Sequence, residues 1–124
     1  MYLLDTNTII DFLNSKLPFN ANQLLFSIDP KISVVTQIEF FSSSKISESE
    51  LFSLNNFIEI VTVFDTIKIE IVLICNHLRK KYKLKLPDAL IAATAISNDL
   101  ILITRNIKDF ENISELTTIY PYDI

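Results

Sequence analysis

The chain has 124 residues, of which 49% are hydrophobic, so it is long enough to bury a core and too apolar to be intrinsically disordered. It contains no glycine, which excludes the glycine-rich phosphate-binding loops of P-loop and dinucleotide-binding proteins. The formal net charge of −4 argues against a protein that coats nucleic acid by bulk electrostatic attraction, but not against an enzyme that handles phosphates through bound metal ions.

The same composition indicates the compartment and the number of domains. No apolar run is long enough to cross a bilayer, and the N-terminus lacks the basic and apolar segments of a signal peptide. Cys75 is the single cysteine, which agrees with a reducing environment. We therefore expect a soluble, cytoplasmic protein without membrane contact, folded as one domain over residues 1–124. Without glycine, left-handed backbone positions should fall mostly to Asn and Asp.

The first elements are a short strand and two helices. Tyr2–Leu4 is predicted to be a strand because it is apolar and leads directly into a helical pattern. That pattern predicts a helix over about Thr8–Leu13. Beyond Pro18 a second helix should run to about Ile28, with Asn20 or Asn22 as its N-terminal cap.

Two capping-box spacings mark the next helices. The β-branched segment Ile32–Val35 is predicted to be a strand, and Thr36 and Glu39 have the spacing of a capping box that opens the following helix. Ser47 and Glu50 have the same spacing before another helix. Ile58–Val63 is then predicted to be the third strand.

The second half of the chain begins with the longest predicted helix, from Asp65 into a basic end over residues 79–85. Its apolar stripe comprises Ile67, Ile71, Ile74, Cys75, Leu78 and Tyr82. Pro87 should open the next helix, and Asn98 should end it in place of glycine.

The last strands are predicted at Leu100–Ile103 and Thr118–Tyr120, with a polar loop and one helical turn over Thr104–Phe110 between them. Strands that alternate with helices and carry unbroken apolar runs indicate a parallel sheet covered on both faces. The predicted fold class is therefore α/β: a three-layer α/β/α domain with a central, mainly parallel sheet.

Three acids stand at comparable places in this pattern. Asp5 follows the first strand, Glu39 is expected in the first turn of the helix after the second strand, and Asp88 lies in the first turn of the Pro87 helix. Each alone is explained by helix capping, which contributes about 0.3–1 kcal/mol. Asp88, however, lies among small apolar residues, and Asp5 ends a buried strand, where an unpaired carboxylate is unfavourable.

Carboxylates gathered in one place repel one another unless a cation lies among them. Oxygen ligands without converging histidine or cysteine favour Mg²⁺ or Mn²⁺ over Zn²⁺. Such a metal lowers the pKa of a bound water and binds a phosphate oxygen. The chemistry indicated is hydrolysis of a phosphodiester bond without a side-chain nucleophile.

Four segments carry a resemblance to a known family. They are LLDTN (residues 3–7), TQIEF (36–40), LPDALIAATA (86–95) and ITRNIKDF (103–110). In this order they resemble the signatures of PIN-domain ribonucleases, particularly the VapC-type toxins of bacterial toxin–antitoxin pairs. The resemblance spans essentially the whole chain, and its third segment is the most specific.

The resemblance implies that Asp5, Glu39 and Asp88 form the metal-binding triad of a Mg²⁺- or Mn²⁺-dependent endoribonuclease. Many relatives have a further acid near the position of Asn106, where this chain has an amide. Either Asp109 or Asn106 would then complete the site, directly or through water, and the alternative for Asp109 is that it only caps a turn.

Weaker supporting roles fall to three further residues. Thr104 would orient a carboxylate or a water, and Thr6 and Asn7 would hold Asp5 or a phosphate. The implied partners are an RNA substrate, a cognate antitoxin that wraps the helical surface and blocks the acids, and a second copy of the chain in a symmetric homodimer.

Other functions are compatible with an acid after the first strand. A haloacid-dehalogenase-like phosphohydrolase needs a second acid two residues later, where this chain has Asn7. A receiver domain, with Asp65 as phosphoacceptor, needs an acidic pair and a lysine that the chain does not clearly show. A third alternative is a degenerate domain kept only for partner binding, which the amide at Asn106 favours and the intact triad opposes.

Overall fold

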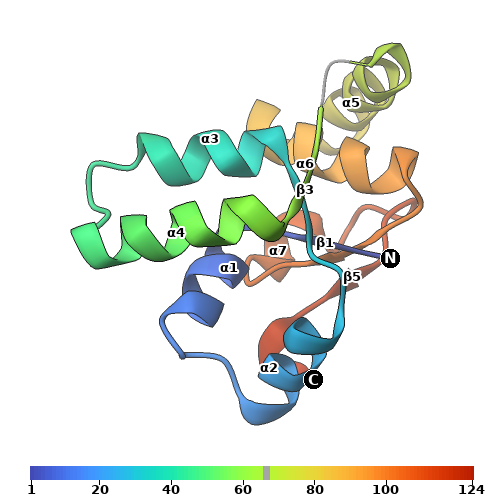
Figure 1. Cartoon of the computed structure of the whole chain (residues 1–124). Helices are drawn as coiled ribbons and strands as arrows, with labels where there is room; N and C mark the ends of the chain where they lie inside the picture. The colour runs from blue at the N-terminus through green and yellow to red at the C-terminus, as the bar shows by residue number, and fades with distance from the viewer. Residues whose placement is uncertain (66–67) are drawn as a thin grey trace.

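Strands and helices alternate along the chain, as the sequence pattern predicts. The computed structural model describes residues 1–65 and 68–124 (Figure 1). The elements in chain order are β1 (Tyr2–Leu4), α1 (Thr6–Leu13), α2 (Phe19–Ser27), β2 (Lys31–Ser33), α3 (Val34–Ser42), α4 (Glu48–Ile60), β3 (Thr62–Phe64), α5 (Ile69–Tyr82), α6 (Leu86–Ser97), β4 (Ile101–Ile103), α7 (Ile107–Phe110), β5 (Thr118–Ile119) and a final 3₁₀ turn, η1 (Pro121–Asp123).

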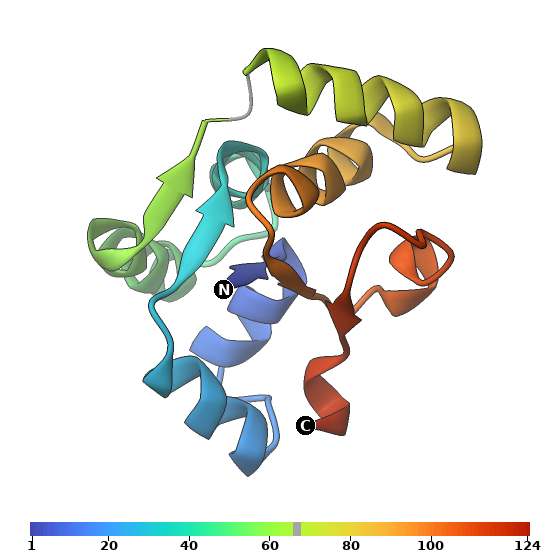
Figure 2. The same ribbon diagram turned by 90° about the vertical axis from the view of Figure 1, so that its right-hand side faces the viewer.

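The strands lie in the order β3-β2-β1-β4-β5, and every pair among the described residues is parallel. β4 forms hydrogen bonds with β1 on one side and β5 on the other, β2 pairs with β3, and β2 lies beside β1. Figure 2 shows the strands running through the middle of the molecule with helices on either side. Parallel strands end at the same edge, so the segments that follow β1, β2 and β4 meet there.

Alternate residues of the central strands build two separate cores. Leu3 and Leu102 face the core formed with α5 and α6. Leu4 and Ile103, one position further along, face the core formed with α1 and α4. Side chains of a strand point alternately to its two faces, so each strand is fixed from both sides. This arrangement confirms the predicted three-layer α/β/α class.

The second strand is shorter than predicted because its last residues turn into a helix. β2 ends at Ser33, whose Oγ accepts a hydrogen bond from the Val35 N–H at 3.0 Å and so caps α3. The predicted capping box at Thr36 and Glu39 is therefore wrong. Thr36 is buried inside the helix, and Glu39 lies in its second turn, not its first.

The predicted strand over Ile58–Val63 is also wrong in its first half, where α4 continues through Ile60. The Ser47 and Glu50 capping box, which is confirmed, starts this helix, and Phe57 is buried on its inner face. The capping box and the burial of the inner face of the helix thus outweigh the preference of its β-branched residues for strands. The strand that follows is β3, at Thr62–Phe64.

The first two helices begin earlier than predicted. Asp5 caps α1, which starts at Thr6 instead of Thr8. In α2, Asn20 and Asn22 both lie inside the helix, and Pro18 precedes it without a side-chain cap, so the predicted caps are wrong. Pro18 fixes the backbone angle before the helix in their place.

In the second half of the chain, the longest helix, α5, begins at Ile69 and not at Asp65 as predicted, while the later elements lie close to their predicted positions. Ile71, Cys75 and Leu78 form the buried stripe of α5, while Ile67 lies outside the described residues. The proline helix α6 carries Pro87 in its first turn and has Asn98 as its C-terminal cap. None of the described helices is long and apolar enough to cross a bilayer.

Three described residues adopt left-handed backbone angles in this glycine-free chain. They are Ser15, Lys83 and Asp99, with φ near 55° in each case. The prediction that Asn and Asp would fill such positions is therefore right only for Asp99. Lys83 ends α5 in this conformation, which turns the chain directly toward α6.

Candidate functional site

Asp5 lies where β1 ends and α1 begins, and its carboxylate is fixed by two hydrogen bonds. Oδ1 accepts from the Thr6 backbone N–H at 2.8 Å, and Oδ2 accepts from the Thr104 hydroxyl at 2.7 Å. The residue is 5% exposed. Burial raises the pKa of Asp5, and the hydrogen bonds from Thr104 and Thr6 oppose that rise.

Thr104 connects the end of β4 to Asp5. β1 and β4 are neighbours in register, so the residues that follow them lie side by side. The fully buried Thr104 hydroxyl donates to Asp5 and accepts from the Asn106 backbone N–H at 3.0 Å. Because that N–H occupies an acceptor position of the hydroxyl, the Thr104 proton is directed at the carboxylate.

Glu39 reaches the same place from α3. Its Oε1 accepts a hydrogen bond from the Thr6 hydroxyl at 2.8 Å. Thr6 therefore binds both acids, Asp5 through its backbone and Glu39 through its side chain. Asp5 and Glu39 come from different helices and are brought together by α1 packing against α3.

Asp88 and Asp109 complete a group of four acids that we call the acidic cluster (Asp5, Glu39, Asp88 and Asp109). Burial at the start of α6, followed by the charges of Asp109, Asp5 and Glu39, raises the pKa of Asp88 to about 6. Lys85 opposes this rise only weakly. The charges of three other carboxylates thus act on the Asp88 side chain, although all four are far apart in the sequence.

The donor set of the cluster fits a hard divalent cation by its chemistry, since it offers carboxylate oxygens and no histidine or thiolate. Among residues 1–65 and 68–124, however, no three Asp, Glu, His or Cys side chains converge closely enough to enclose one ion. Hydrogen bonds hold Asp5 and Glu39 to threonines, and like charges repel. An ion bound among these acids would compete with the hydrogen bonds that Thr6 and Thr104 donate to Asp5 and Glu39.

Two pockets lie beside the cluster, and Lys108 and Asp109 line both of them. One, of about 300 Å³, opens between α6 and α7 and also contains Asp88 and Lys85. The other, of about 380 Å³, contains Arg105, Asn106 and Tyr120 as well. Each pocket therefore combines acids of the cluster with at least one cationic side chain, an arrangement that suits a phosphate held next to a metal ion.

The remaining predicted site residues differ in their surroundings. Asn106 caps the short helix α7, donates its backbone N–H to Thr104 and lines the larger pocket. The Asn7 side chain makes no hydrogen bond within the described part of the chain. Asp109 lies in α7 between the two pockets.

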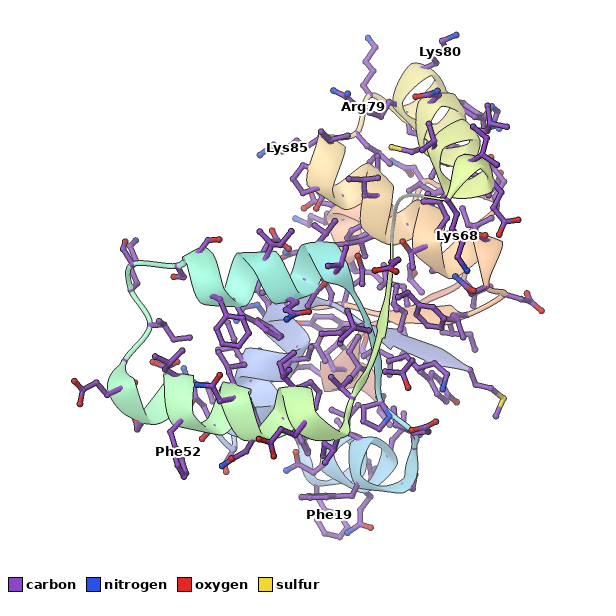
Figure 3. All side chains as sticks on the ribbon, turned by 45° about the horizontal axis from the view of Figure 1, so that its top comes forward. Phe19, Phe52, Lys68, Arg79, Lys80 and Lys85 are labelled. Atoms are coloured by element: carbon purple, nitrogen blue, oxygen red, sulfur yellow. The ribbon has the colours of Figure 1, made fainter. Side chains whose placement is uncertain are left out.

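Other thiol, aromatic and imidazole side chains lie in the core or on the surface. Cys75 is buried, and Phe40 is buried while its neighbour Phe41 is 39% exposed, as expected for adjacent positions on one helix. His77 lies on the surface, where its Nε2 is 3.0 Å from a Glu115 carboxylate oxygen. Figure 3 shows Arg79 and Lys80 pointing outward at the end of α5, and Lys85 at the start of α6.

Sequence reasoning missed a buried acid, Asp11, in α1. Its carboxylate accepts hydrogen bonds from Arg105 and from the Tyr122 hydroxyl. The residues around Asp11 in the sequence give no indication that its carboxylate is buried. Its partners, Arg105 and Tyr122, lie about a hundred residues further along the chain. Only the fold could reveal this contact.

Comparison with known proteins places these features in a family. The sequence matches the family model of the PIN domain over residues 2–116. A chain of a toxin–antitoxin complex from Klebsiella pneumoniae is 33% identical with a TM-score of 0.78, and the match covers 100% of both chains. A chain of VapBC2 from Rickettsia felis, bound to a DNA fragment from the promoter, is 26% identical with a TM-score of 0.77, covering 95% of this chain and 96% of that one.

A third solved structure agrees with these two. A chain of VapBC-1 from nontypeable Haemophilus influenzae is 25% identical with a TM-score of 0.75, covering 95% of this chain and 96% of that one. No curated protein sequence matches the chain. The matches confirm the predicted fold class and the resemblance stated on the four segments, and they favour it over the phosphohydrolase and receiver classes.

The raised pKa of Asp88 predicts how stability depends on pH without metal. A carboxyl whose pKa is raised on folding stabilises the fold while protonated, and that contribution is lost as pH rises through about 6. Asp88→Asn, which stays neutral, should therefore unfold at a higher temperature than wild type at pH 8 in EDTA. The effect should be on the order of 1 kcal/mol, because partial exposure reduces what the shift alone would give.

The control is Asp99→Asn, an exposed position outside the cluster. Thermal unfolding between pH 4 and pH 8 should separate Asp88→Asn from wild type increasingly as pH rises through about 6, and the difference should then stay constant. Asp99→Asn should run parallel to wild type. Equal pH dependence of wild type and Asp88→Asn would show that neither burial nor the other carboxylates raises the pKa of Asp88.

Proposed function

The chain belongs to the PIN-domain family, and from that premise we propose that it is a metal-dependent endoribonuclease, the toxin of a toxin–antitoxin pair. The observation that carries the proposal is the acidic cluster. Burial raises the pKa of Asp88, and the charges of Asp109, Asp5 and Glu39, from three other segments, raise it further. A fold gains no stability from such repulsion, so a bound cation is the physical reason to keep them together.

In this proposal Asp5, Glu39, Asp88 and Asp109 hold Mg²⁺ or Mn²⁺. The ion, when bound, supplies a Lewis acid for the phosphate and lowers the pKa of a water molecule. Thr104 and the Thr6 backbone keep the Asp5 carboxylate in one orientation. Lys85 and Lys108, at the rim of the smaller pocket, attract the RNA backbone that the net charge of −4 would otherwise repel.

Protein partners follow from the relatives and from the exposed apolar surface. The similar structures include toxin–antitoxin and VapBC complexes. Phe19, Phe26 and Phe52 are each more than 65% exposed here, and Figure 3 shows Phe19 and Phe52 projecting from α2 and α4. We propose that a cognate antitoxin covers part of this helical surface and blocks the cluster, that the chain forms a symmetric homodimer, and that it works in the cytoplasm.

One observation favours a second candidate, a partner-binding module without catalysis. No three ligating side chains within the described ranges enclose a single point, and Asn106 is an amide where the resemblance to the family leads one to expect an acid. Such a module would form the same protein complexes but would neither bind Mn²⁺ at the cluster nor gain thermal stability from it.

The first test is RNA cleavage. The wild-type protein should cleave RNA with Mg²⁺ or Mn²⁺, and EDTA should abolish cleavage. Asp5→Asn and Asp88→Asn should each reduce the rate at least about 100-fold, since even residues behind the ligands of a metal site typically change activity 10–100-fold. Asp29→Asn, at an exposed acid paired with Lys31, should leave the rate unchanged. Undiminished cleavage by both cluster variants would refute the proposed role of the acids.

The second test separates Asp109 from Asn106. The charge of Asp109 acts on both Asp5 and Asp88, whereas the Asn106 contact to Thr104 uses only its backbone. We therefore expect Asp109→Asn to weaken Mn²⁺ binding at least about 10-fold, and Asn106→Ala to change it by less than about 3-fold. Isothermal titration of both variants measures the difference. The opposite ranking would assign the fourth ligand to Asn106.

A further inference from the structure

Asp11 is a charged residue buried in the middle of a helix, and it accepts three hydrogen bonds. The Arg105 Nη1 atom lies 3.2 Å from Oδ1 and 3.3 Å from Oδ2, and the Tyr122 hydroxyl lies 2.8 Å from Oδ2. The Asp11 side chain is 2% exposed, whereas that of Arg105 is 43% exposed. The contact thus joins a buried anion to a cation that reaches the surface.

Stability alone does not account for this arrangement. Removing a carboxylate from water is unfavourable, and pairing it with a cation often only compensates for that loss. An apolar residue beside Ile10 and Phe12 would fill the same place without a charge to neutralise. The ion pair does, however, fix the guanidinium group of Arg105, which would otherwise sample many rotamers at the surface.

The fixed guanidinium lies next to the acidic cluster. Arg105 directly follows Thr104, whose hydroxyl donates to Asp5. It lines the 380 Å³ pocket together with Asn106, Lys108 and Asp109. Only Nη1 of Arg105 forms hydrogen bonds with other described residues, so Nε and Nη2 retain donors for a ligand.

We propose that Arg105 binds a phosphate of the RNA strand adjacent to the one that is cleaved, and that Asp11 and Tyr122 are the positioning residues that hold Arg105 for this contact. The inference rests on the proposed ribonuclease function for the identity of the ligand. A guanidinium group suits a phosphate because its planar donors match two phosphate oxygens. Lys108, in the same pocket, adds a second positive charge.

The sharpest test is Asp11→Asn, because an effect of net charge and a role of Asp11 in positioning Arg105 predict opposite changes in RNA affinity. This substitution removes one negative charge from an acidic protein, so bulk attraction alone would tighten RNA binding. A positioning role predicts weaker binding, since the amide holds the guanidinium less firmly. Asp99→Asn changes the net charge equally at an exposed site away from Arg105 and should leave binding unchanged or slightly tighter.

The measurement is fluorescence anisotropy of a labelled single-stranded RNA oligonucleotide in EDTA, where metal-dependent cleavage does not interfere. Arg105→Ala should weaken binding about 10-fold and reduce the slope of log affinity against log salt by about 0.7, the value for one phosphate contact on a single strand. Arg105→Lys should retain most of that slope. Introduced into the wild-type protein, Asp11→Asn should weaken RNA binding. Introduced into Arg105→Ala, it should not weaken binding further, because both substitutions remove the same contact.

Tyr122→Phe is a milder variant that tests the same contact if Asp11→Asn does not fold. It leaves the ion pair intact and removes one hydrogen bond to Asp11, so RNA binding should weaken less than in Asp11→Asn while the protein stays folded by circular dichroism. Where the oligonucleotide is cleaved with Mg²⁺, Arg105→Ala, Asp11→Asn and Tyr122→Phe should each raise KM more than they lower kcat.

Equal affinity of wild type and Arg105→Ala, including no binding by either, would overturn the proposal. Tighter binding by a folded Asp11→Asn would also overturn the positioning role. RNA binding that depends on Arg105 but is never followed by cleavage with Mg²⁺ or Mn²⁺ would refute the nuclease function and leave the Arg105 contact standing.

Discussion

Repulsion among four carboxylates at one edge of a sheet is the constraint on which the site depends. Burial raises the pKa of Asp88, and the nearby charges of Asp109, Asp5 and Glu39 raise it further. The fold resists the repulsion with neutral donors: Thr6 binds Asp5 and Glu39, and Thr104 binds Asp5. The hydrogen bonds to Asp5 and Glu39 thus come from hydroxyl and amide groups, which hold these two acids without adding a positive charge.

The strands and their two cores keep this edge in place. Leu3 and Leu4 are both fully buried or nearly so, on opposite faces of β1, so the residue after them has little freedom to move. The same holds for Leu102 and Ile103 in β4. Asp5 and Thr104 therefore start from rigid strand ends, and their 2.7 Å hydrogen bond follows from the pairing of β1 with β4. Precise placement of a metal ligand benefits from such support.

The sequence predicted those parts of the fold that depend on local patterns. Tyr2–Leu4 was identified to the residue because a short apolar run leads into a helical pattern, and the Ser47 and Glu50 capping box was identified by its spacing. The errors occurred where tertiary packing outweighed local preference. Val34 and Ile58 favour strands by their branched side chains, yet both lie in helices that bury one face.

The residues of the candidate site could be predicted from the sequence only in part. The acids and Thr104 stand in recognisable segments, so the family resemblance identified them. Whether Asp109 or Asn106 would complete the proposed metal site, and whether Glu39 would turn toward a bound ion, depends on side-chain positions that no spacing encodes. Asp11 gave no signal, because its burial results from Arg105 and Tyr122, which reach it from the other end of the chain.

The central claim, that the acidic cluster encloses a divalent cation, is tested most directly by the anomalous diffraction of crystals grown or soaked with Mn²⁺. The account predicts an anomalous peak in contact with carboxylate oxygens of Asp5, Glu39 and Asp88, with the Glu39 side chain turned away from Thr6. An Mn²⁺-saturated crystal with no peak among these acids, or with its peak elsewhere on the surface, would contradict it.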